Sequence, residues 1–268
     1  MSEVAVRDAP PRVDLAAELA SFQRDGYLVV RGFWSPADCA LIEREVRGAL
    51  DPVLGPVEYE AEVGYPGAPV DRGAPGGDTP RRLLFAYSRF PTLRRFATAP
   101  ALRDYLAPLL QVDGSAPSRV LLSQCHHNCV MTKAPGFSSA TLWHQDVRYW
   151  SFAEPALISA WLALGPEHAG NGALQVIAGT HRERFAPERL DERKFLRPEV
   201  PANAALIATA RTVELAAGDL LLFHCRTFHA AGRNGSDSVK LSPVFTYRGD
   251  SNPPLPGTRS SAYPDIPL

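Results

Sequence analysis

Two residues with metal-binding side chains, His144 and Asp146, are separated by one residue in the stretch Trp-His-Gln-Asp. Side chains i and i+2 of a β-strand project from the same face, so we expect this imidazole and this carboxylate to point the same way. Joined by a second imidazole from a distant strand, they would form the facial triad of non-haem Fe(II) oxygenases. The alternative is a simple His–Asp pair at a strand end.

Four downstream histidines could supply the second imidazole: His168, His181, His224 and His229. His168 and His181 lie in polar or charged, turn-like segments, which favours surface roles. His224 lies within an apolar strand, which is typical of a core histidine. His229 falls where that strand runs out, and a ligand at a strand end leaves coordination positions open. We therefore expect His229 to complete the triad.

A second group of metal-binding residue types comprises Cys125, His126, His127 and Cys129. It lacks a second ligand pair at the spacing of zinc sites, and adjacent histidines in a strand face opposite ways. The sequence therefore disfavours zinc there. Neither a G-x-S-x-G motif nor a P-loop is present, which leaves a hydrolase or NTPase without support.

The elements that must position these residues are helices first and strands afterwards. Helical spacing of apolar residues predicts helices over 15–22, 36–50 and 91–110, and 27–30 is typical of a short strand. From residue 118, apolar runs between Gly and Asn turns predict further strands at 120–124, 129–132, 157–164, 173–177, 212–215, 219–224 and 239–247. This order indicates an α+β fold with one mainly β core, a sandwich, jelly roll or barrel.

We expect one domain over 1–268 with three irregular segments. Residues 1–13 and the Pro-rich residues 249–268 are predicted to be tails. Nine of the 17 residues at 64–80 are Gly or Pro, which indicates a loop that is either a disordered insertion or a lid over an active site.

Composition limits the class of protein. A net charge of -1 disfavours nucleic-acid binding, and no apolar run approaches the ~20 residues of a membrane span. No signal peptide is visible, and the four cysteines are too few for a disulfide framework at this length. We expect a cytoplasmic protein whose partner is a small molecule; the sequence does not indicate its oligomeric state.

Four stretches also carry a family resemblance: FQRDGYLVVRGF at 22–33, HQDVRYWSF at 144–152, NGALQVIAGTH at 171–181 and the run 218–234. In this order, over most of residues 20–248, they resemble the phytanoyl-CoA dioxygenase family. The resemblance implies a double-stranded β-helix, or cupin-like jelly roll, with N-terminal and flanking helices. It also implies a hydroxylase that uses Fe(II), 2-oxoglutarate and O2, with iron held by His144, Asp146 and His229. Halogenases on this scaffold have a small residue in place of Asp146, so halogenation is disfavoured.

The resemblance also suggests how 2-oxoglutarate is bound. The family has an Arg eleven residues past the second His that binds the distal carboxylate, and Lys240 stands there; Arg248 is the alternative. Lysine provides a point charge and not a bidentate fork. The family's small hydroxyl residue, two positions past the same His, is replaced by Ala231. Gln145 and Trp161 match positions that line this pocket, although Trp161 is equally typical of a packed core residue.

Other residues near the predicted ligands suggest the substrate. Lys133 is either a further carboxylate-binding residue or a solvated loop lysine. Candidates for substrate contacts are Arg148, Tyr149, Trp150 and Arg226. If they face the cavity, they suit an anionic molecule with a flat or apolar part.

Several substrate classes and two other functions remain open. The substrate could be an amino acid, an acyl compound, a secondary metabolite or a sugar acid. The stretch HQDVRYWSF also resembles bacterial hydroxylases of the Kdo sugar. Because Lys240 and Ala231 differ from the residues usual in the family, two other functions stay open: a non-catalytic jelly-roll binding protein, and a cupin-like metalloenzyme independent of 2-oxoglutarate.

Overall fold

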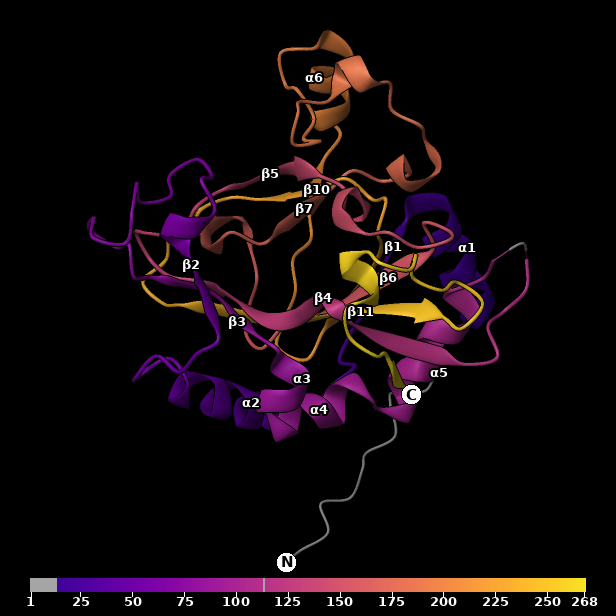
Figure 1. Ribbon diagram of the computed structural model, residues 1–268, viewed down its shortest axis with the longest axis horizontal. Helices are drawn as coiled ribbons and strands as arrows, with labels where there is room; N and C mark the ends of the chain where they lie inside the picture. The colour runs from indigo at the N-terminus through magenta and orange to yellow at the C-terminus, as the bar shows by residue number, and fades with distance from the viewer. Residues whose placement is uncertain (1–13, 113) are drawn as a thin grey trace, which may run out of the picture.

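The computed structural model describes residues 14–112 and 114–268, so the tail expected over 1–13 lies outside the described residues. Its strands form two antiparallel sheets that lie one above the other, with helices beneath the larger sheet (Figure 1). This is the jelly roll with N-terminal and flanking helices that the sequence predicts, so the fold class is confirmed.

The two sheets divide the strands unequally. The larger sheet has, in spatial order, β1 (Tyr27–Val30), β9 (Leu220–His224), β6 (Leu157–Leu162), β11 (Lys240–Gly249), β4 (Val120–Lys133), β3 (Pro80–Leu84) and β2 (Val57–Tyr59), with β12 (Ile266–Pro267) also paired to β4. The smaller sheet has β5 (Thr141–His144), β10 (His229–Ala231), β7 (Leu174–Val176) and β8 (Arg211–Thr212).

The α-helices are α1 (Leu15–Asp25), α2 (Pro36–Gly48), α3 (Ala86–Arg89), α4 (Pro91–Ala97), α5 (Pro100–Leu109) and α6 (Pro201–Ile207). Single 3₁₀ turns are η1 (Glu60–Glu62), η2 (Asp146–Tyr149), η3 (Ala169–Asn171), η4 (Thr180–Arg182), η5 (Pro187–Arg189) and η6 (Arg259–Ser261). The helix predicted over 91–110 is in fact two helices. Ala99 is extended, because a residue before proline is disfavoured in the α region, and Pro100 then begins α5.

Two apolar cores hold these layers together. Ile42, Leu93 and Leu106 belong to the helices and are fully buried in a cluster that also contains residues of the larger sheet. A second cluster lies between the sheets and includes Trp161 and Leu174. The smaller sheet therefore lies over apolar residues of the larger one, with its strand ends free to carry polar groups.

Strand β4 contains the irregularity that matters most for the site. The sequence suggested separate strands at 120–124 and 129–132, but one 14-residue strand spans both. On β11, the consecutive residues Phe245 and Thr246 pair with Asn128 and Ser123. Residues 124–127 thus form a bulge, which re-aims side chains locally.

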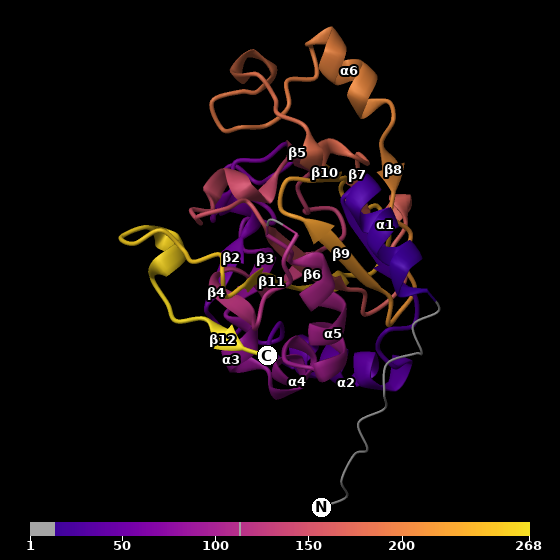
Figure 2. The ribbon, with the colours of Figure 1, turned by 90° about the vertical axis from the view of Figure 1, so that its right-hand side faces the viewer.

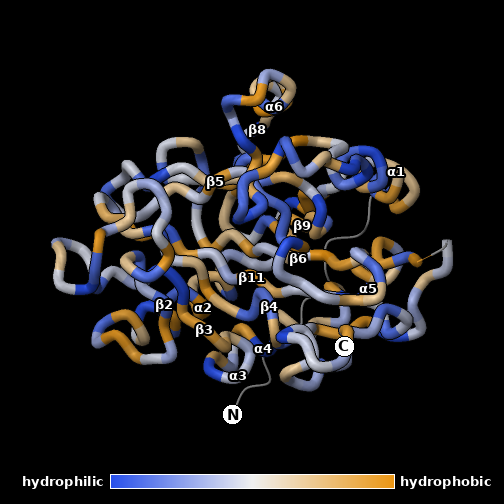
Figure 3. The backbone as a smooth tube through the Cα atoms, turned by 45° about the horizontal axis from the view of Figure 1, so that its top comes forward, coloured by the Kyte–Doolittle hydropathy of each residue, from blue (hydrophilic) through white to orange (hydrophobic). Residues whose placement is uncertain are grey.

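Three segments outside the sheets lie against or above them. The Gly/Pro-rich 64–80 forms a series of turns, and the Pro-rich 249–268 runs back so that β12 pairs with β4. The insertion between β7 and β8 carries α6, which stands above the sheets in both ribbon views (Figure 2). Hydrophobic and hydrophilic segments alternate along the chain (Figure 3), and within the described part of the chain no helix has the length and apolar character needed to cross a membrane.

Candidate active site

The structure brings the three expected metal-binding residues together at one end of a cavity of about 190 Å³. His144 and His229 are directly opposite each other on β5 and β10. The Nε2 atoms of His144 and His229 lie 3.6 Å and 3.5 Å from Oδ1 of Asp146. All three side chains are buried, and one ligand atom from each lies within 4.8 Å of the others.

Asp146 reaches this position by a different route from the expected one. Strand β5 ends at His144, and Asp146 begins η2, so the two residues do not share a strand face. The turn from strand to 3₁₀ helix brings the carboxylate back beside the imidazole. Ser159 on β6 donates a hydrogen bond of 3.2 Å to Oδ2 of Asp146 and fixes its orientation.

Hydrogen bonds to the backbone set the tautomers of both histidines. Nδ1 of His144 is 2.8 Å from the Leu142 carbonyl, and Nδ1 of His229 is 3.0 Å from the Thr227 carbonyl. Because a carbonyl only accepts, each Nδ1 carries the proton and each Nε2 presents a lone pair to the cavity. This is the state that a metal ligand requires.

The charges of the triad suit a divalent metal ion. Burial, and then the neighbouring His144, lowers the pKa of His229 to about 4, so this imidazole is neutral at pH 7. Burial alone would raise the pKa of Asp146, but the imidazoles of His127 and His229 outweigh it and hold that pKa below its usual range. Two neutral imidazoles and one carboxylate facing a cavity are the donor set of non-haem Fe(II) sites, so these residues fit that ion.

The β4 bulge places two adjacent histidines in the cavity wall. His126 and His127 both line the cavity, contrary to the expectation that neighbours in a strand face opposite ways. The bulge removes the strict alternation there. Nε2 of His127 lies 3.6 Å from Oδ1 of Asp146. This histidine belongs to the group for which the sequence disfavoured a zinc site, and it lies beside the triad.

Two lysines line the opposite end of the cavity. Lys240 is buried and its Nζ is 2.9 Å from Oε2 of Glu167. Lys133 is also buried, and its Nζ donates to the carbonyls of Ser139, at 3.0 Å, and Gly232, at 2.6 Å. Burial, and then the nearby cations, lowers the pKa of Lys133 to about 7. Lys133 is thus a buried wall residue and not a solvated loop lysine.

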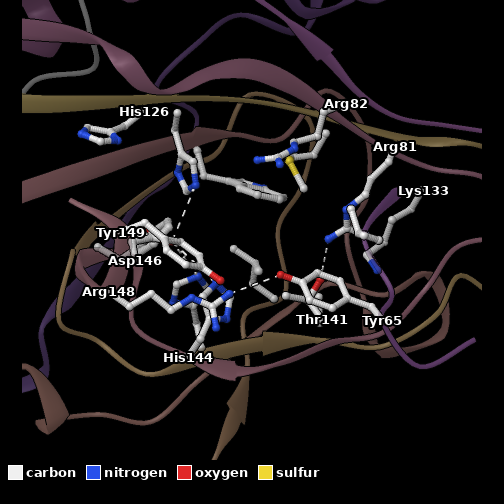
Figure 4. A pocket seen from close by; sticks show the side chains of 18 of the residues that line it. Tyr65, Arg81, Arg82, His126, Lys133, Thr141, His144, Asp146, Arg148 and Tyr149 are labelled. Carbon is white, nitrogen blue, oxygen red and sulfur yellow. Dashed lines mark hydrogen bonds and ion pairs between the residues drawn. The ribbon is translucent and has the colours of Figure 1, made fainter. Parts of the chain in front are cut away.

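Arginines and aromatic residues form the remaining wall. In Figure 4, Arg81 and Lys133 lie on one side of the cavity, and His144, Asp146 and Arg148 lie on the other. Arg148 donates to the hydroxyl of Tyr65 at 3.2 Å, and its guanidinium lies 3.9 Å from the centre of the Phe195 ring.

The structure separates the other predicted site residues into two groups. Those that line the cavity are Trp161, Arg148, Tyr149, Trp150 and Ala231. Gln145 and Arg226 do not line it: the Gln145 amide donates to the Arg226 carbonyl, and the Arg226 guanidinium donates to the Glu183 carbonyl.

The proposed alternative to Lys240 is wrong. The Arg248 guanidinium forms an ion pair with Asp265 in the C-terminal segment and does not line the cavity. Its place in β11 explains this, because Arg248 is eight positions past Lys240 and therefore lies at the far end of the strand.

The three rejected histidines lie away from the triad. His224 and His181 contact each other, with ring centres 5.4 Å apart, and His181 approaches the Gln23 carbonyl. His168 is exposed and caps η3.

Sequence reasoning missed several wall residues: Tyr65, Arg81, Arg82, His127 and Arg259. It also missed Glu167, which does not line the cavity but forms an ion pair with Lys240. Tyr65 belongs to the Gly/Pro-rich segment 64–80, and Arg259 belongs to the expected C-terminal tail. The one available signal for Glu167 was an acid three positions past the predicted strand 157–164; nothing in the sequence around Arg259 marked it.

Comparisons with known proteins agree with this geometry. The family described as phytanoyl-CoA dioxygenase (PhyH) matches residues 22–242. The ectoine dioxygenase of Bordetella parapertussis is 24% identical over 256 residues, which cover 88% of this chain and 76% of that protein.

Solved structures share the fold. EctD from S. alaskensis with 2-oxoglutarate and 5-hydroxyectoine has a TM-score of 0.70 at 20% identity, and the match covers 98% of this chain and 92% of that one. The epimerase SnoN, in complex with Fe3+, alpha ketoglutarate and nogalamycin RO, has a TM-score of 0.67 at 23% identity and covers 95% of each chain.

The family match spans most of the chain, includes all three triad residues and favours an enzyme over a non-catalytic binding protein. The chain therefore belongs to the phytanoyl-CoA dioxygenase family of iron- and 2-oxoglutarate-dependent oxygenases.

Proposed function

We propose that this enzyme binds Fe(II) through His144, Asp146 and His229 and hydroxylates an aliphatic C–H bond of a small anionic molecule. The observation that supports an anionic substrate is the charge of the cavity wall. Among the residues that the structure describes, six Lys or Arg side chains line the cavity against a single carboxylate, that of Asp146.

Some of these cations are paired with carboxylates that do not line the cavity. Arg82 forms an ion pair with Glu58, and Arg81 is close to Glu58 and Glu60. These two arginines shape the wall but offer little net charge to a ligand.

Three cations have no carboxylate partner among the described residues: Lys133, Arg148 and Arg259. Bound Fe(II), the Asp146 carboxylate and dianionic 2-oxoglutarate together carry a net negative charge that one of these cations balances. The other two leave an excess of positive charge, which an anionic substrate would neutralise.

The wall also indicates how the substrate is oriented. Arg148 is the unpaired cation nearest the triad in sequence, and its planar guanidinium can bind a carboxylate or phosphate through two parallel hydrogen bonds. Tyr149 and Trp150 line the same wall and provide aromatic faces for an apolar part. An anion held at Arg148 would place a neighbouring C–H bond toward the triad.

When bound, iron and 2-oxoglutarate supply the oxidant from O2, with release of succinate and CO2 and insertion of one oxygen atom into the C–H bond. The chain's own residues position the reactants and exclude water. Ser159 keeps the Asp146 carboxylate oriented, and the backbone carbonyls of Leu142 and Thr227 keep the two imidazoles in the ligand tautomer.

The test is succinate formation by protein loaded with Fe(II), in air, with 2-oxoglutarate and matched pairs of compounds. Each carboxylic acid, including a sugar acid such as Kdo and amino acids, is compared with its own amide or ester, which lacks the carboxylate charge; ectoine is included because relatives are named for it. We expect acids to stimulate succinate formation and their amides and esters to fail. Equal stimulation by both members of the pairs would rule out an anionic substrate.

The variant R148Q should raise the KM for the active acid about tenfold or more, because a charge-assisted hydrogen bond is lost, while the affinity for 2-oxoglutarate stays the same. R44Q is the matched control, since Arg44 is exposed on α2, away from the cavity. Activity with iron but without 2-oxoglutarate would instead support the cupin-like alternative.

A further inference from the structure

Two lysines oppose each other at the end of the cavity away from the triad. Lys133 ends β4 and Lys240 begins β11, and they are direct partners in the antiparallel ladder. Both line the cavity with only 7% of their surface exposed. Like charges directly opposite each other are destabilising, so the way in which each lysine is neutralised decides what it can bind.

Lys240 is neutralised within the protein. Its ammonium is paired with Oε2 of Glu167 and lies 3.3 Å from the Ser242 hydroxyl. Glu167 is 2% exposed, and its Oε1 accepts hydrogen bonds from Nε1 of Trp161, at 2.9 Å, and from the Ser242 hydroxyl, at 2.7 Å. The carboxylate is therefore fixed by three donors, and it would repel a second carboxylate brought to Lys240.

Lys133 is not neutralised by the protein. Its two hydrogen bonds go to backbone carbonyls, and no carboxylate lies within ion-pair distance of its Nζ among residues 14–112 and 114–268. An ammonium has three N–H donors, so one remains for a ligand. A buried cation without a counter-ion is costly, and an anionic ligand removes that cost.

The position of Lys133 also suits a ligand that is bound to the metal at its other end. Gly232, whose carbonyl accepts from Lys133, is three residues past His229, which is roughly 10 Å of extended chain. A five-carbon dicarboxylate spans a comparable length together with its bond to the metal at one end and its hydrogen bond to the ammonium at the other. Ala231, between them, lines the cavity and leaves the path open.

We infer that Lys133, and not Lys240, binds the distal carboxylate of 2-oxoglutarate, while Glu167 keeps Lys240 as a neutral wall pair. This assignment rests on the proposed use of 2-oxoglutarate. It moves the binding charge from β11, where the family resemblance places it, to β4.

The test is calorimetric titration of 2-oxoglutarate into protein loaded with Ni(II), which replaces iron and prevents turnover. K133M should weaken binding by about tenfold or more, because a buried charge-assisted contact is lost. K240M should have a smaller effect. K194M is the matched control, since Lys194 lies in the insertion that carries α6 and does not line the cavity.

A second variant separates a binding role from a structural one. E167Q keeps an acceptor for Trp161 and Ser242 but removes the charge that neutralises Lys240. In the double variant K133M/E167Q, Lys240 becomes the unpaired cation, so we expect part of the lost affinity to return. A residue that only supported the fold would not be rescued in this way.

The outcomes separate this inference from the proposed function. Loss of binding in K240M with retention in K133M would overturn the inference and leave 2-oxoglutarate as the cosubstrate. Absence of binding in the wild-type protein with Ni(II) bound would contradict the proposed function itself. If K133M does not fold, K133Q, which keeps a donor for the carbonyls but no charge, provides the same test.

Discussion

The two ends of the cavity differ in how complete they are. At the triad end, backbone carbonyls orient the two imidazoles and the Ser159 hydroxyl orients the Asp146 carboxylate, so the ligand atoms already face the cavity. At the lysine end, one ammonium is paired with Glu167, while Lys133 has only backbone carbonyls. The metal site is thus preassembled, whereas the anion site is completed only by its ligand. A preassembled site limits the reorganisation needed on binding, while an incomplete one makes binding selective for charge.

The largest expected effect is the loss of metal affinity when a ligand is removed from the preassembled end of the cavity. H229A removes one of three ligands, so metal affinity should fall by more than the 10–100-fold that is typical of losing an outer-shell partner. Anaerobic titration with Fe(II) and 2-oxoglutarate, followed by the visible charge-transfer band, measures this loss. H168Q, at an exposed histidine, is the control, and an unchanged band in H229A would contradict the triad.

Stability should separate the two lysines at the other end. K240M leaves the Glu167 carboxylate buried without its partner, and breaking a buried pair costs about 3–5 kcal/mol. K133M removes a buried charge that has no counter-ion, so its loss of unfolding free energy should be smaller than that of K240M by about 2 kcal/mol or more. Urea unfolding of the ligand-free variants compares them, and equal losses would show that Lys133 is balanced by the protein.

The pH dependence of 2-oxoglutarate binding tests the same asymmetry. The groups facing Lys133 are the cations Arg81 and Lys240 and the acids Glu60 and Glu167, and burial dominates in lowering its pKa to about 7. Only the protonated amine binds a carboxylate strongly. Affinity should therefore be full below pH 7 and fall by up to about tenfold per pH unit above it. Calorimetry from pH 6 to 9 checks this, and K133M should show a flat profile.

The smallest effect should come from completing the anion site. A231S restores the hydroxyl that the family resemblance leads us to expect, on a residue that lines the cavity. One added hydrogen bond of about 0.5–1.5 kcal/mol should tighten 2-oxoglutarate binding roughly 2–10-fold. Unchanged affinity would mean that bound 2-oxoglutarate does not lie next to residue 231 of β10.

The sequence was most informative where local spacing determines chemistry. The grouping of His144, Asp146 and His229 was predicted from the i, i+2 spacing and from the position of His229 where an apolar run ends. The residues were right, although the turn into η2, and not a shared strand face, brings Asp146 to the site. The alternation of short strands and turns predicted a sandwich, jelly roll or barrel, and the family resemblance pointed to the jelly roll that the structure shows. The cluster containing Glu167 could not be predicted, because its contacts with Lys240 depend on pairing across more than 70 residues.

Errors arose where tertiary context changed a local pattern. Arg226 and Gln145 lie close to the ligands in sequence, but each donates to a backbone carbonyl outside the cavity. His127 was set aside by strict strand alternation, which the bulge interrupts. Arg259 enters the wall only because the C-terminal segment runs back along β4.

The bulge at 124–127 has a practical consequence for engineering this enzyme. Its four residues are held between Ser123 and Asn128, which are paired with β11, and two of the four line the cavity. Substitutions at His126 and His127 change the cavity wall, while the residues that pair with β11 on either side of the bulge stay the same. A saturation library confined to this bulge is therefore a compact way to redirect substrate choice while the scaffold stays intact.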